Sequence, residues 1–378
     1  MRPTVGIVGA GQLARMAQQA AIPLGIDLRV LADSPEDSAA QVIPGVFVGD
    51  HRIFDDLHRL AKAVDVLTFD HELPDPEHLA ALAGQGLLLR PGPRTKVFAQ
   101  DKLHQRNELS ARGFPVPAFA RVQEVADVEA FAEEHGWPVV LKAPRGGYDG
   151  RGVFVVEDAA AAAGALDNSA PLLAEVMVPL VREVAVLVAR RPSGHSVTWP
   201  IVETVQVDGI LRELVVPAPL DHARAQQARS IGQHIAEAID LTGVMAVELF
   251  DTGTELLINE LACRPHNSGH WTIEGSATSQ FANHLRAVLD WPLGDTSPLA
   301  PAIVTVNVLG RQDGFDPADG REAALAVPGV GIHLYGKQAR PGRKLGHVTA
   351  LGTDPVEVRE RARAAAAALG EPLTKEES

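Results

Sequence analysis

The sequence predicts an α/β protein of two or three domains. Its 378 residues exceed the usual length of one domain. Residues 4–9 form a β-branched run that ends in glycine, and residues 12–24 carry apolar side chains at helical spacing. Strand-like runs at 28–32 and 64–69 follow. This strand–helix–strand order predicts a parallel α/β unit over residues 1–95, which the turn RPGPR at 90–94 closes.

Composition excludes several classes of protein. The balance of 34 Lys and Arg against 48 Asp and Glu gives a net charge of −14, which disfavours nucleic acid and anionic membranes as partners. Cys263 is the only cysteine, so no disulfide forms within the chain, and we expect a small buried side chain there. The start MRPTVGIVGAGQL does not resemble a signal peptide, and no apolar run approaches 18 residues. We therefore expect a cytoplasmic protein.

The first glycine motif is Gly9-Ala10-Gly11-Gln12-Leu13-Ala14, which fits G-x-G-x-x-G/A between a strand and a helix. Small residues at such a turn let the backbone approach a phosphate at a helix N-terminus. Asp33 follows at a distance suited to a ribose contact. Many α/β turns share the pattern, so a dinucleotide, another anionic ligand and plain packing all stay open.

A second glycine motif lies in the middle of the chain. We expect a helix over 95–112, a break at 113–117 and a helix over 125–135. The strand 138–142 ends at Lys142, the segment GGYDGRG at 146–152 follows, and 153–156 is again a strand. Four glycines in seven residues favour a loop that covers phosphates over a plain hairpin turn, and Lys142 would add a positive charge.

Two carboxylates then occur in apolar strands. After further strands at 172–178, 183–190, 197–207 and 211–216 and a helix at 221–241, residues 244–250 and 256–261 predict an antiparallel hairpin. The hairpin can bring Glu248 and Glu260 to one face, with Asn259 beside them. Hard oxygen ligands suit Mg²⁺ that bridges nucleotide phosphates. The alternative is a pair of structural glutamates held by arginines.

Two polar segments complete the candidate site. Arg264–His270 directly follows the hairpin and has the composition of a substrate loop, although a solvated loop fits equally well. The basic turn 336–347 would either clamp a phosphate monoester or lie exposed. The remaining expected elements are helices at 276–290 and 355–369, and residues 302–309 start the last region of the chain.

Together these segments resemble the ATP-grasp enzymes, and among them most closely the N5-carboxyaminoimidazole ribonucleotide synthase family. The resemblance covers nearly the whole chain. The residues that carry it are GAGQLARM at 9–16, AQDK at 99–102, LKAPRGGYDGRG at 141–152, AEVMV at 174–178, REVAVLVAR at 182–190, VMAVELF at 244–250, LLINELACRPHNSGHWT at 256–272, SQFANHLRAVLDWPLG at 279–294 and YGKQARPGRKLGHV at 335–348. The chain departs from the family pattern at Ala14, Asp70, Thr204 and Cys263, whereas Glu72 is retained.

The resemblance implies an ATP-grasp fold with a Rossmann-like N-terminal domain. Its parts would be an N-terminal α/β domain (1–95), a lid domain with the glycine-rich loop (96–178), the catalytic grasp domain (179–300) and a C-terminal extension (301–378). ATP would bind between the lid and the main sheet, and the resemblance implies two Mg²⁺ ions with it. The implied nucleotide-binding residues are Lys102, Lys142, Gly147, Tyr148, Asp149, Gly150, Arg151, Gly152, Glu175, Val176, Met177, Val178, Glu183, Glu203, Asn259 and Glu260, and the implied metal ligands are Glu248 and Glu260.

The resemblance also implies the reaction. ATP would activate bicarbonate, the co-substrate, as carboxyphosphate, and 5-aminoimidazole ribonucleotide would accept the carboxyl group, in purine biosynthesis. The implied substrate-binding residues are Gly11, Gln12, Leu13, Tyr148, Arg151, Lys337, Arg343 and Lys344, and the implied catalytic residues are Arg264, His266, Asn267, Ser268 and Lys337. A homodimer is implied by the family alone.

Three other functions stay open at this point. A nicotinamide or flavin oxidoreductase would explain the first glycine motif but not Glu248, Glu260 or the second motif. An ATP-grasp relative with another acceptor would be stimulated by formate instead of bicarbonate. A nucleotide sensor would bind ATP without turnover, which the full set of charged site residues disfavours.

Overall fold

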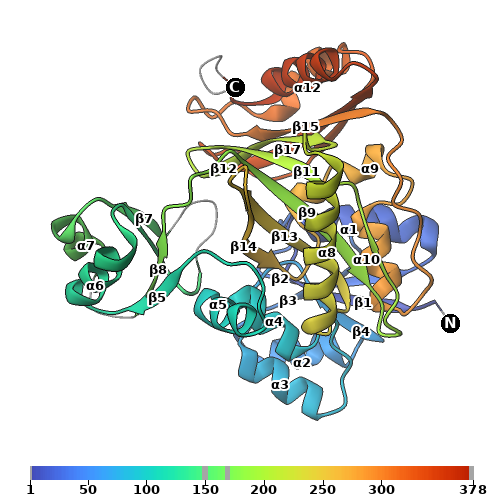
Figure 1. Cartoon of the computed structure of the whole chain (residues 1–378). Helices are drawn as coiled ribbons and strands as arrows, with labels where there is room; N and C mark the ends of the chain where they lie inside the picture. Colours follow the sequence, from blue (N-terminus) through green and yellow to red (C-terminus); the bar gives the residue numbers. More distant parts are fainter. Residues whose placement is uncertain (1, 147–151, 167–170, 374–378) are drawn as a thin grey trace.

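The computed structural model describes residues 2–146, 152–166 and 171–373 (Figure 1). Its strands form three sheets, one near the N-terminus, one in a lid that projects from the body, and one large central sheet. Figure 1 shows the lid, with β5–β8, α6 and α7, apart from the rest of the chain. No helix in the described segments is long and apolar enough to cross a membrane.

The first sheet is parallel, in the order β3-β2-β1-β4. Its strands are β1 (Thr4–Val8), β2 (Asp27–Ala32), β3 (Gly45–Val48) and β4 (Val66–Phe69), and its helices are α1 (Gln12–Leu24), α2 (Phe54–Ala61) and α3 (Pro76–Gly84). The predicted parallel unit is confirmed, with β3, α2 and α3 in addition. Helix α1 ends at Gly25, whose φ of 65° lies in the left-handed region that glycine adopts at little cost.

Two short helices connect this sheet to the lid, α4 (Pro93–Gln100) and α5 (Lys102–Ala111). The single helix predicted over 95–112 is wrong, because the backbone is extended at Asp101. The carboxylate of Asp101 accepts a hydrogen bond from the backbone N–H of His104 at 3.0 Å and so caps α5. This break places Lys102 at the first position of α5.

The lid is an antiparallel sheet in the order β5-β8-β6-β7. Its elements are β5 (Phe119–Val122), α6 (Val125–His135), β6 (Val139–Lys142), β7 (Val153–Val156), α7 (Ala159–Ala165) and β8 (Leu172–Val176). Both helices pack on one face, where Val128, Phe131 and Leu141 are buried. The predicted strands on both sides of the second glycine motif are confirmed, and they pair with each other.

The large sheet has the order β14-β13-β9-β11-β12-β15-β17-β16, and β10 pairs with β9. Its strands are β9 (Arg182–Arg190), β10 (Ser196–Thr198), β11 (Val202–Val207), β12 (Ile210–Val216), β13 (Gly243–Asp251), β14 (Leu256–Ala262), β15 (Ala302–Leu309), β16 (Val330–Leu334) and β17 (Lys344–Gly352). The strand predicted over 197–207 is interrupted at Trp199, which is buried, and at Pro200. Because β12 pairs with β15, one sheet joins the hairpin to the C-terminal strands.

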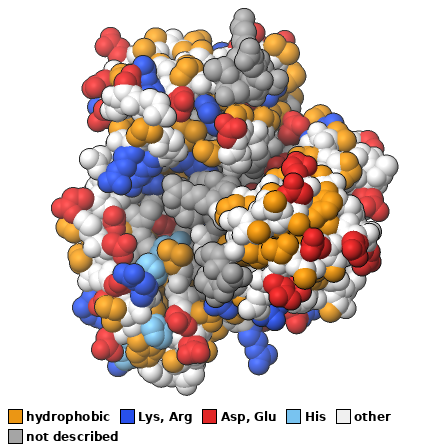
Figure 2. Space-filling view, turned by 90° about the vertical axis from the view of Figure 1, so that its left-hand side faces the viewer, with side chains coloured by type: hydrophobic (Ala, Val, Ile, Leu, Met, Phe, Trp, Pro, Cys, Tyr) orange, Lys and Arg blue, Asp and Glu red, His pale blue; other side chains and the backbone are white. Residues whose placement is uncertain are grey.

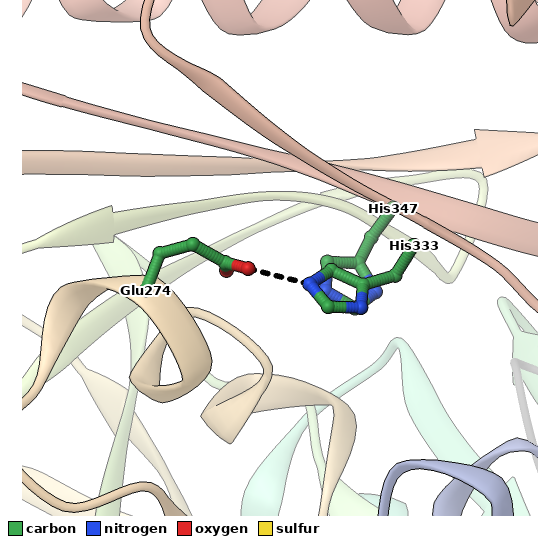
Figure 3. Close-up of side chains that lie close together, drawn as sticks. All are labelled: Glu274, His333 and His347. Carbon is green, nitrogen blue, oxygen red and sulfur yellow. Dashed lines mark hydrogen bonds and ion pairs between the residues drawn. The ribbon is translucent and has the colours of Figure 1, made fainter. Parts of the chain in front are cut away.

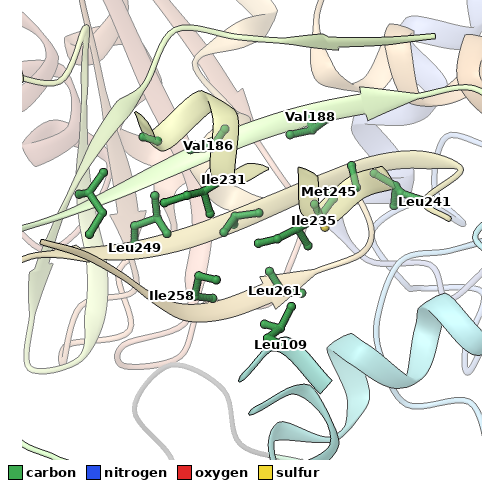
Figure 4. Packing of buried hydrophobic residues seen from close by; sticks show 14 of the residues in the cluster. Leu109, Val186, Val188, Ile231, Ile235, Leu241, Met245, Leu249, Ile258 and Leu261 are labelled. Carbon is green, nitrogen blue, oxygen red and sulfur yellow. The ribbon is translucent and has the colours of Figure 1, made fainter. Parts of the chain in front are cut away.

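Helices cover both faces of this sheet. They are α8 (His222–Ala238), α9 (Thr272–Gly275), α10 (Gln280–Val288), α11 (Arg321–Leu325) and α12 (Pro355–Leu369), with 3₁₀ turns η1 (Asn267–Gly269) and η2 (Pro317–Gly320). Figure 4 shows the core between α8 and the sheet, where Ile231 and Ile235 pack against Val186, Met245 and Leu249. Helix α10 begins at Gln280 and not at 276, because the Ser279 side chain accepts a hydrogen bond from Ala282 N and caps it.

Candidate functional site

The predicted hairpin brings the two predicted metal ligands to one face of the large sheet. Glu248 in β13 pairs directly with Glu260 in β14, and a register shift follows between Glu248 and Leu249. Glu248 also pairs with Ala185 of β9, and Glu183 lies two positions before Ala185 in that strand. Since alternate residues of a strand share a face, all three carboxylates are on the side opposite α8.

These carboxylates fit a divalent cation. Partial burial, with Glu260 and Glu183 nearby as like charges, raises the pKa of Glu248 from 4.5 to about 8. Burial also raises the pKa of Glu183, whose carboxylate is 3.5 Å from Gln206 Nε2. Carboxylates that repel one another in this way form a hard oxygen donor set, and a bound Mg²⁺ would favour their charged forms.

Two lysines face the carboxylates from the lid side. Lys102 Nζ lies 2.8 Å from Glu260 Oε2. Lys142, at the end of β6, lies 2.6 Å from Glu175 Oε2 and donates to Asn259 Oδ1 at 3.2 Å. In such an arrangement the ammonium groups can contact phosphate oxygens while the carboxylates hold a metal ion.

Arg106 is a site residue that the sequence did not indicate. Its side chain is buried in α5 and pairs with Glu175, while its Nη2 donates to the carbonyl oxygen of Asn259 at 2.6 Å. Arg106 thereby ties the lid strand β8 to the metal-site strand β14. Glu175, predicted at the nucleotide hinge, directs its side chain to Arg106 and Lys142.

The rest of the predicted nucleotide-binding set divides into three groups. Val176 ends β8, and Met177 and Val178 follow it outside regular structure, with Met177 exposed. Gly152 is described, and its carbonyl oxygen accepts from Ala143 N at 2.8 Å. The predictions for Gly147, Tyr148, Asp149, Gly150 and Arg151 lie outside the described residues.

The structure does not bring Glu203 to this face. Glu203 pairs with Val184 of β9, and Val184 packs in the core under α8. Its neighbour Val202 pairs with Ala185 and packs in the core on the other face. The alternation of the strand therefore places Glu203 and Glu248 on opposite sides of the sheet.

The loop after β14 is folded against the carboxylates. His266 Nε2 is 3.7 Å from Glu248 Oε1, and its Nδ1 is 2.9 Å from Ser268 Oγ. Gln280 holds the His266 backbone from both sides, because it accepts from His266 N at 2.9 Å and donates to His266 O at 2.7 Å. Burial, with Arg264 nearby, lowers the pKa of His266 to about 3, so its ring is neutral at physiological pH.

Two further side chains of this loop are placed to meet a ligand. The amide nitrogen and oxygen of Asn267 are both buried and have no hydrogen-bond partner within the described structure. Arg264 is paired with Glu72, 3.1 Å from its Nε, and its Nη1 donates to Pro265 O at 3.1 Å. Of the two alternatives for this segment, the solvated loop does not fit, because Ser268 and His270 are fully buried.

The first glycine motif meets the C-terminal basic segment. Lys337 Nζ donates to Gln12 Oε1, and Gly11 N donates to the carboxylate of Asp70. Leu13 is buried in the core beneath α1. Ser38 Oγ donates to Tyr335 O at 2.6 Å, which fastens the C-terminal segment to the first domain.

The other predicted phosphate ligands lie along the same basic segment. Arg343 Nη1 donates to Gln338 O at 3.1 Å. The turn predicted over 336–347 ends earlier, because Lys344 begins β17 and pairs with Leu309 of β15. Figure 2 shows a group of Lys and Arg side chains on the surface at the left of the view.

One glutamate and two histidines form a cluster next to Tyr335, the residue before this segment (Figure 3). Glu274, His333 and His347 offer ligand atoms within 4.8 Å of one another, but the two imidazoles are stacked, 4.6 Å between centroids and 16° between planes. A metal ion lies in the plane of each imidazole that binds it, so these rings do not share one ion in this arrangement. His347 Nδ1 instead meets the hydroxyl of Tyr335 at 2.7 Å, and the Tyr335 ring lies 5.6 Å from Lys337 Nζ. The cluster is therefore connected to Lys337 through the Tyr335 side chain.

Comparisons with known proteins cover most of the chain. The ribonucleotide synthetase preATP-grasp domain matches residues 1–100, the ATP-grasp domain matches 107–281, and the phosphoribosylaminoimidazole carboxylase C-terminal domain matches 304–361. The N5-carboxyaminoimidazole ribonucleotide synthase of Mycobacterium bovis is 47% identical over 375 residues, which cover 96% of this chain and 87% of that protein.

Solved structures agree with these matches. The N5-carboxyaminoimidazole ribonucleotide synthetase of Thermus thermophilus is 38% identical with a TM-score of 0.88, and the alignment covers 98% of this chain and 99% of that one. The synthase of Aspergillus clavatus in complex with ADP and 5-aminoimidazole ribonucleotide is 32% identical with a TM-score of 0.88, over 97% of this chain and 98% of that one. The ATP-grasp fold predicted from the sequence is confirmed, and the chain belongs to the N5-carboxyaminoimidazole ribonucleotide synthase family.

Proposed function

We propose that this chain carboxylates 5-aminoimidazole ribonucleotide in an ATP-dependent reaction, giving N5-carboxyaminoimidazole ribonucleotide, ADP and phosphate, with bicarbonate as the carboxyl source. One observation carries the proposal. Glu248 and Glu260, with Lys102 and Lys142, form a phosphate and metal face that directly adjoins the loop from Arg264 to Ser268. The family to which the chain belongs carries out this reaction on the same fold.

The phosphate face would serve the first half of the reaction. Lys102 and Lys142 would leave their carboxylate partners, or share them, to contact the ATP phosphates. Mg²⁺ held by Glu248 and Glu260 would supply charge neutralisation at the transferred phosphoryl group. Glu183, buried on the same face beside Gln206, would accept from the ribose hydroxyls.

The loop after β14 would serve the second half. Bicarbonate is a poor electrophile until phosphorylation gives its carbon a good leaving group. Arg264 would hold the resulting carboxyphosphate with paired charge-assisted hydrogen bonds, and the amide of Asn267 has both polar atoms available for a ligand. His266 stays neutral and so adds no positive charge beside the metal ligands.

The acceptor would bind between the first domain and the basic segment. Gly11, Gln12 and Leu13 lie at the start of α1, where the Gln12 side chain meets Lys337 and the Asp70 carboxylate accepts from Gly11 N. Lys337, Arg343 and Lys344 would contact the 5′-phosphate, and closure of the lid would keep water from the labile intermediate. Tyr148 and Arg151 would add contacts from the glycine-rich loop in this proposal. The family likeness also leads us to expect two Mg²⁺ ions, a homodimer and a cytoplasmic location.

The test is ADP release from Mg-ATP and bicarbonate, with and without 5-aminoimidazole ribonucleotide. We expect strong stimulation by the ribonucleotide and an acid-labile carboxylated product. ATP binding without stimulation would overturn the acceptor, and stimulation by formate instead of bicarbonate would replace the carboxyl donor. Light scattering of the purified chain would test the dimer.

A further inference from the structure

Arg264 is the end of a chain of charges that reaches back into the first domain. Glu72 follows β4, and its two carboxylate oxygens meet different cations. Its Oε1 lies 3.1 Å from Arg264 Nε, and its Oε2 pairs with Lys96 Nζ of α4. Three segments that are distant in sequence therefore converge on one carboxylate, one of them the predicted substrate loop.

Lys96 is unusual because it is fully buried, with 0% of its side chain exposed. Its ammonium also donates to His71 O at 2.9 Å and lies 4.7 Å from the centre of the Phe69 ring. Gln100, one turn further along α4, donates to Glu72 O at 2.9 Å. A lysine is almost never fully buried without a partner, so this environment is built around the Glu72 carboxylate.

Two contacts hold the Arg264 guanidinium. The Glu72 carboxylate pairs with its charge on the Nε side, where Nε and Oε1 lie 3.1 Å apart without hydrogen-bond geometry, and the carbonyl oxygen of Pro265 takes a hydrogen bond from Nη1. The residue before it, Cys263, is buried beside Thr95, the neighbour of Lys96. The planar fork of an arginine recognises an oxyanion only when its plane is correctly turned, so anything that sets this plane affects how the oxyanion is held.

We propose that Lys96 and Glu72 are positioning residues, which orient Arg264 toward the carboxyphosphate that the loop would hold. Lys96 fixes Glu72, and the charge of Glu72 holds the guanidinium in place on its Nε side. The inference deepens the proposed function and rests on it. If Arg264 loses this orientation, carboxyphosphate is still formed but is held poorly, and water competes with the amine of the ribonucleotide for its carboxyl group.

The experiment compares three variants, Glu72→Gln, Lys96→Met and the double variant Lys96→Met/Glu72→Gln. The readout is the amount of carboxylated product formed per ADP released, together with the thermal midpoint. Lys96→Met alone leaves a buried carboxylate with one cation fewer and is expected to destabilise the chain. The double variant removes both charges and is expected to recover much of that stability. Its activity therefore reports on the positioning of Arg264 without a large loss of folding stability.

We expect kcat/KM for the ribonucleotide to fall about tenfold in Glu72→Gln and in the double variant, because a small displacement of a positioning group has effects of this order. The product formed per ADP should fall to roughly half of the wild-type value or below as water intercepts the intermediate. The matched control is Glu213→Gln, which removes another buried carboxylate between two cations, Arg359 and Arg363, under α12. Its product per ADP should equal that of the wild type.

The outcomes separate the two proposals. If the wild type shows no stimulation by the ribonucleotide, the proposed function fails before any variant is compared. If the wild type is stimulated and the folded double variant still forms one product per ADP, Lys96 and Glu72 are structural only and the inference is overturned. A loss of coupling in Glu213→Gln equal to that in Glu72→Gln would also overturn it.

Discussion

The large sheet holds acidic side chains in two regions whose surroundings differ. Under α12, Glu213 is fully buried, and its oxygens pair with Arg359 Nη2 at 2.6 Å and with Arg363. At the hairpin end, Glu248 and Glu260 face each other, with Lys102 on Glu260 and the neutral His266 3.7 Å from Glu248. The charge of the first region is neutralised by cations of the chain itself, whereas the second region places carboxylates together whose charged forms need a bound cation.

The comparison of these two regions gives a criterion that distinguishes structural from functional carboxylates in this protein. A carboxylate whose oxygens both meet cations of the chain gains nothing from an added metal ion, as at Glu213 or Glu175. A carboxylate whose nearest charged neighbours are other carboxylates has a raised pKa and is stabilised by a cation, as at Glu248. Substitutions in the two regions should therefore affect different properties.

The largest effect is expected at the hairpin. Glu260→Gln removes one of the two carboxylates proposed to hold Mg²⁺ and leaves Lys102 without its partner. We expect kcat for ADP release to fall by about 10²–10³-fold, the usual scale for removal of one electrostatic stabiliser of a transition state. A Mg²⁺ titration of initial rates measures it. Glu213→Gln is the control, and near-normal turnover of Glu260→Gln at ordinary Mg²⁺ would assign the hairpin to the structural class.

A smaller effect is expected at the acceptor end. Lys337→Ala removes the ammonium that lies on Gln12 and over Tyr335. We expect KM for the ribonucleotide to rise by about 10–100-fold with KM for ATP unchanged, because a hydrogen bond to a charged group contributes about 1.5–3 kcal/mol. Lys62→Ala, an exposed lysine after α2, is the matched control. An equal rise in both KM values would show that Lys337 supports the whole site and not the phosphate monoester.

The structural region should respond in stability instead. Glu213→Gln leaves Arg359 and Arg363 without their common carboxylate, but their side chains are 37% and 28% exposed and can turn to water. We therefore expect a loss of about 2 kcal/mol in the free energy of unfolding, below the full cost of an unpaired buried charge. Urea unfolding measures this loss, with Lys62→Ala again as the control. A variant as stable as the wild type would contradict the comparison.

These regions also show what sequence reasoning could and could not predict. Glu248 and Glu260 stood in apolar strands on both sides of a clear turn, so the pattern indicated that they could share a face, although it did not fix the pairing register on which this depends. The Asp101 cap was a local signal as well, since aspartate is a preferred N-cap, and the predicted helix over 95–112 overlooked it. Arg106, Lys96 and Glu72 act through partners 24–192 residues away, and no local periodicity encodes such contacts.

Face assignment shows the same limit at Glu203. The family resemblance implied a nucleotide contact for Glu203, whereas its pairing with Val184 turns it toward α8. A shift of one residue in register would have reversed its face. Register depends on the partner strand, which is β9 here and lies earlier in the chain. The pattern of a single strand therefore identifies the types of residue in a site better than it identifies the face of the sheet on which they lie.

The smallest effect concerns protons and gives the sharpest separation of the two regions. Without a cation, Glu248 has a pKa of about 8, raised from 4.5, so at pH 7 the folded protein holds a proton that the unfolded chain has released. This upward shift of the pKa has two consequences. The contribution of Glu248 to stability falls as the pH rises from 4.5 to 8, and Mg²⁺ binding at pH 7 should release close to one proton. Calorimetric titration with Mg²⁺ in two buffers of different ionisation enthalpy measures that proton. At pH 9 the carboxylate is already charged, so the release should nearly vanish. If no proton is released at pH 7, cations of the chain already hold the hairpin carboxylates in their charged form, as at Glu213.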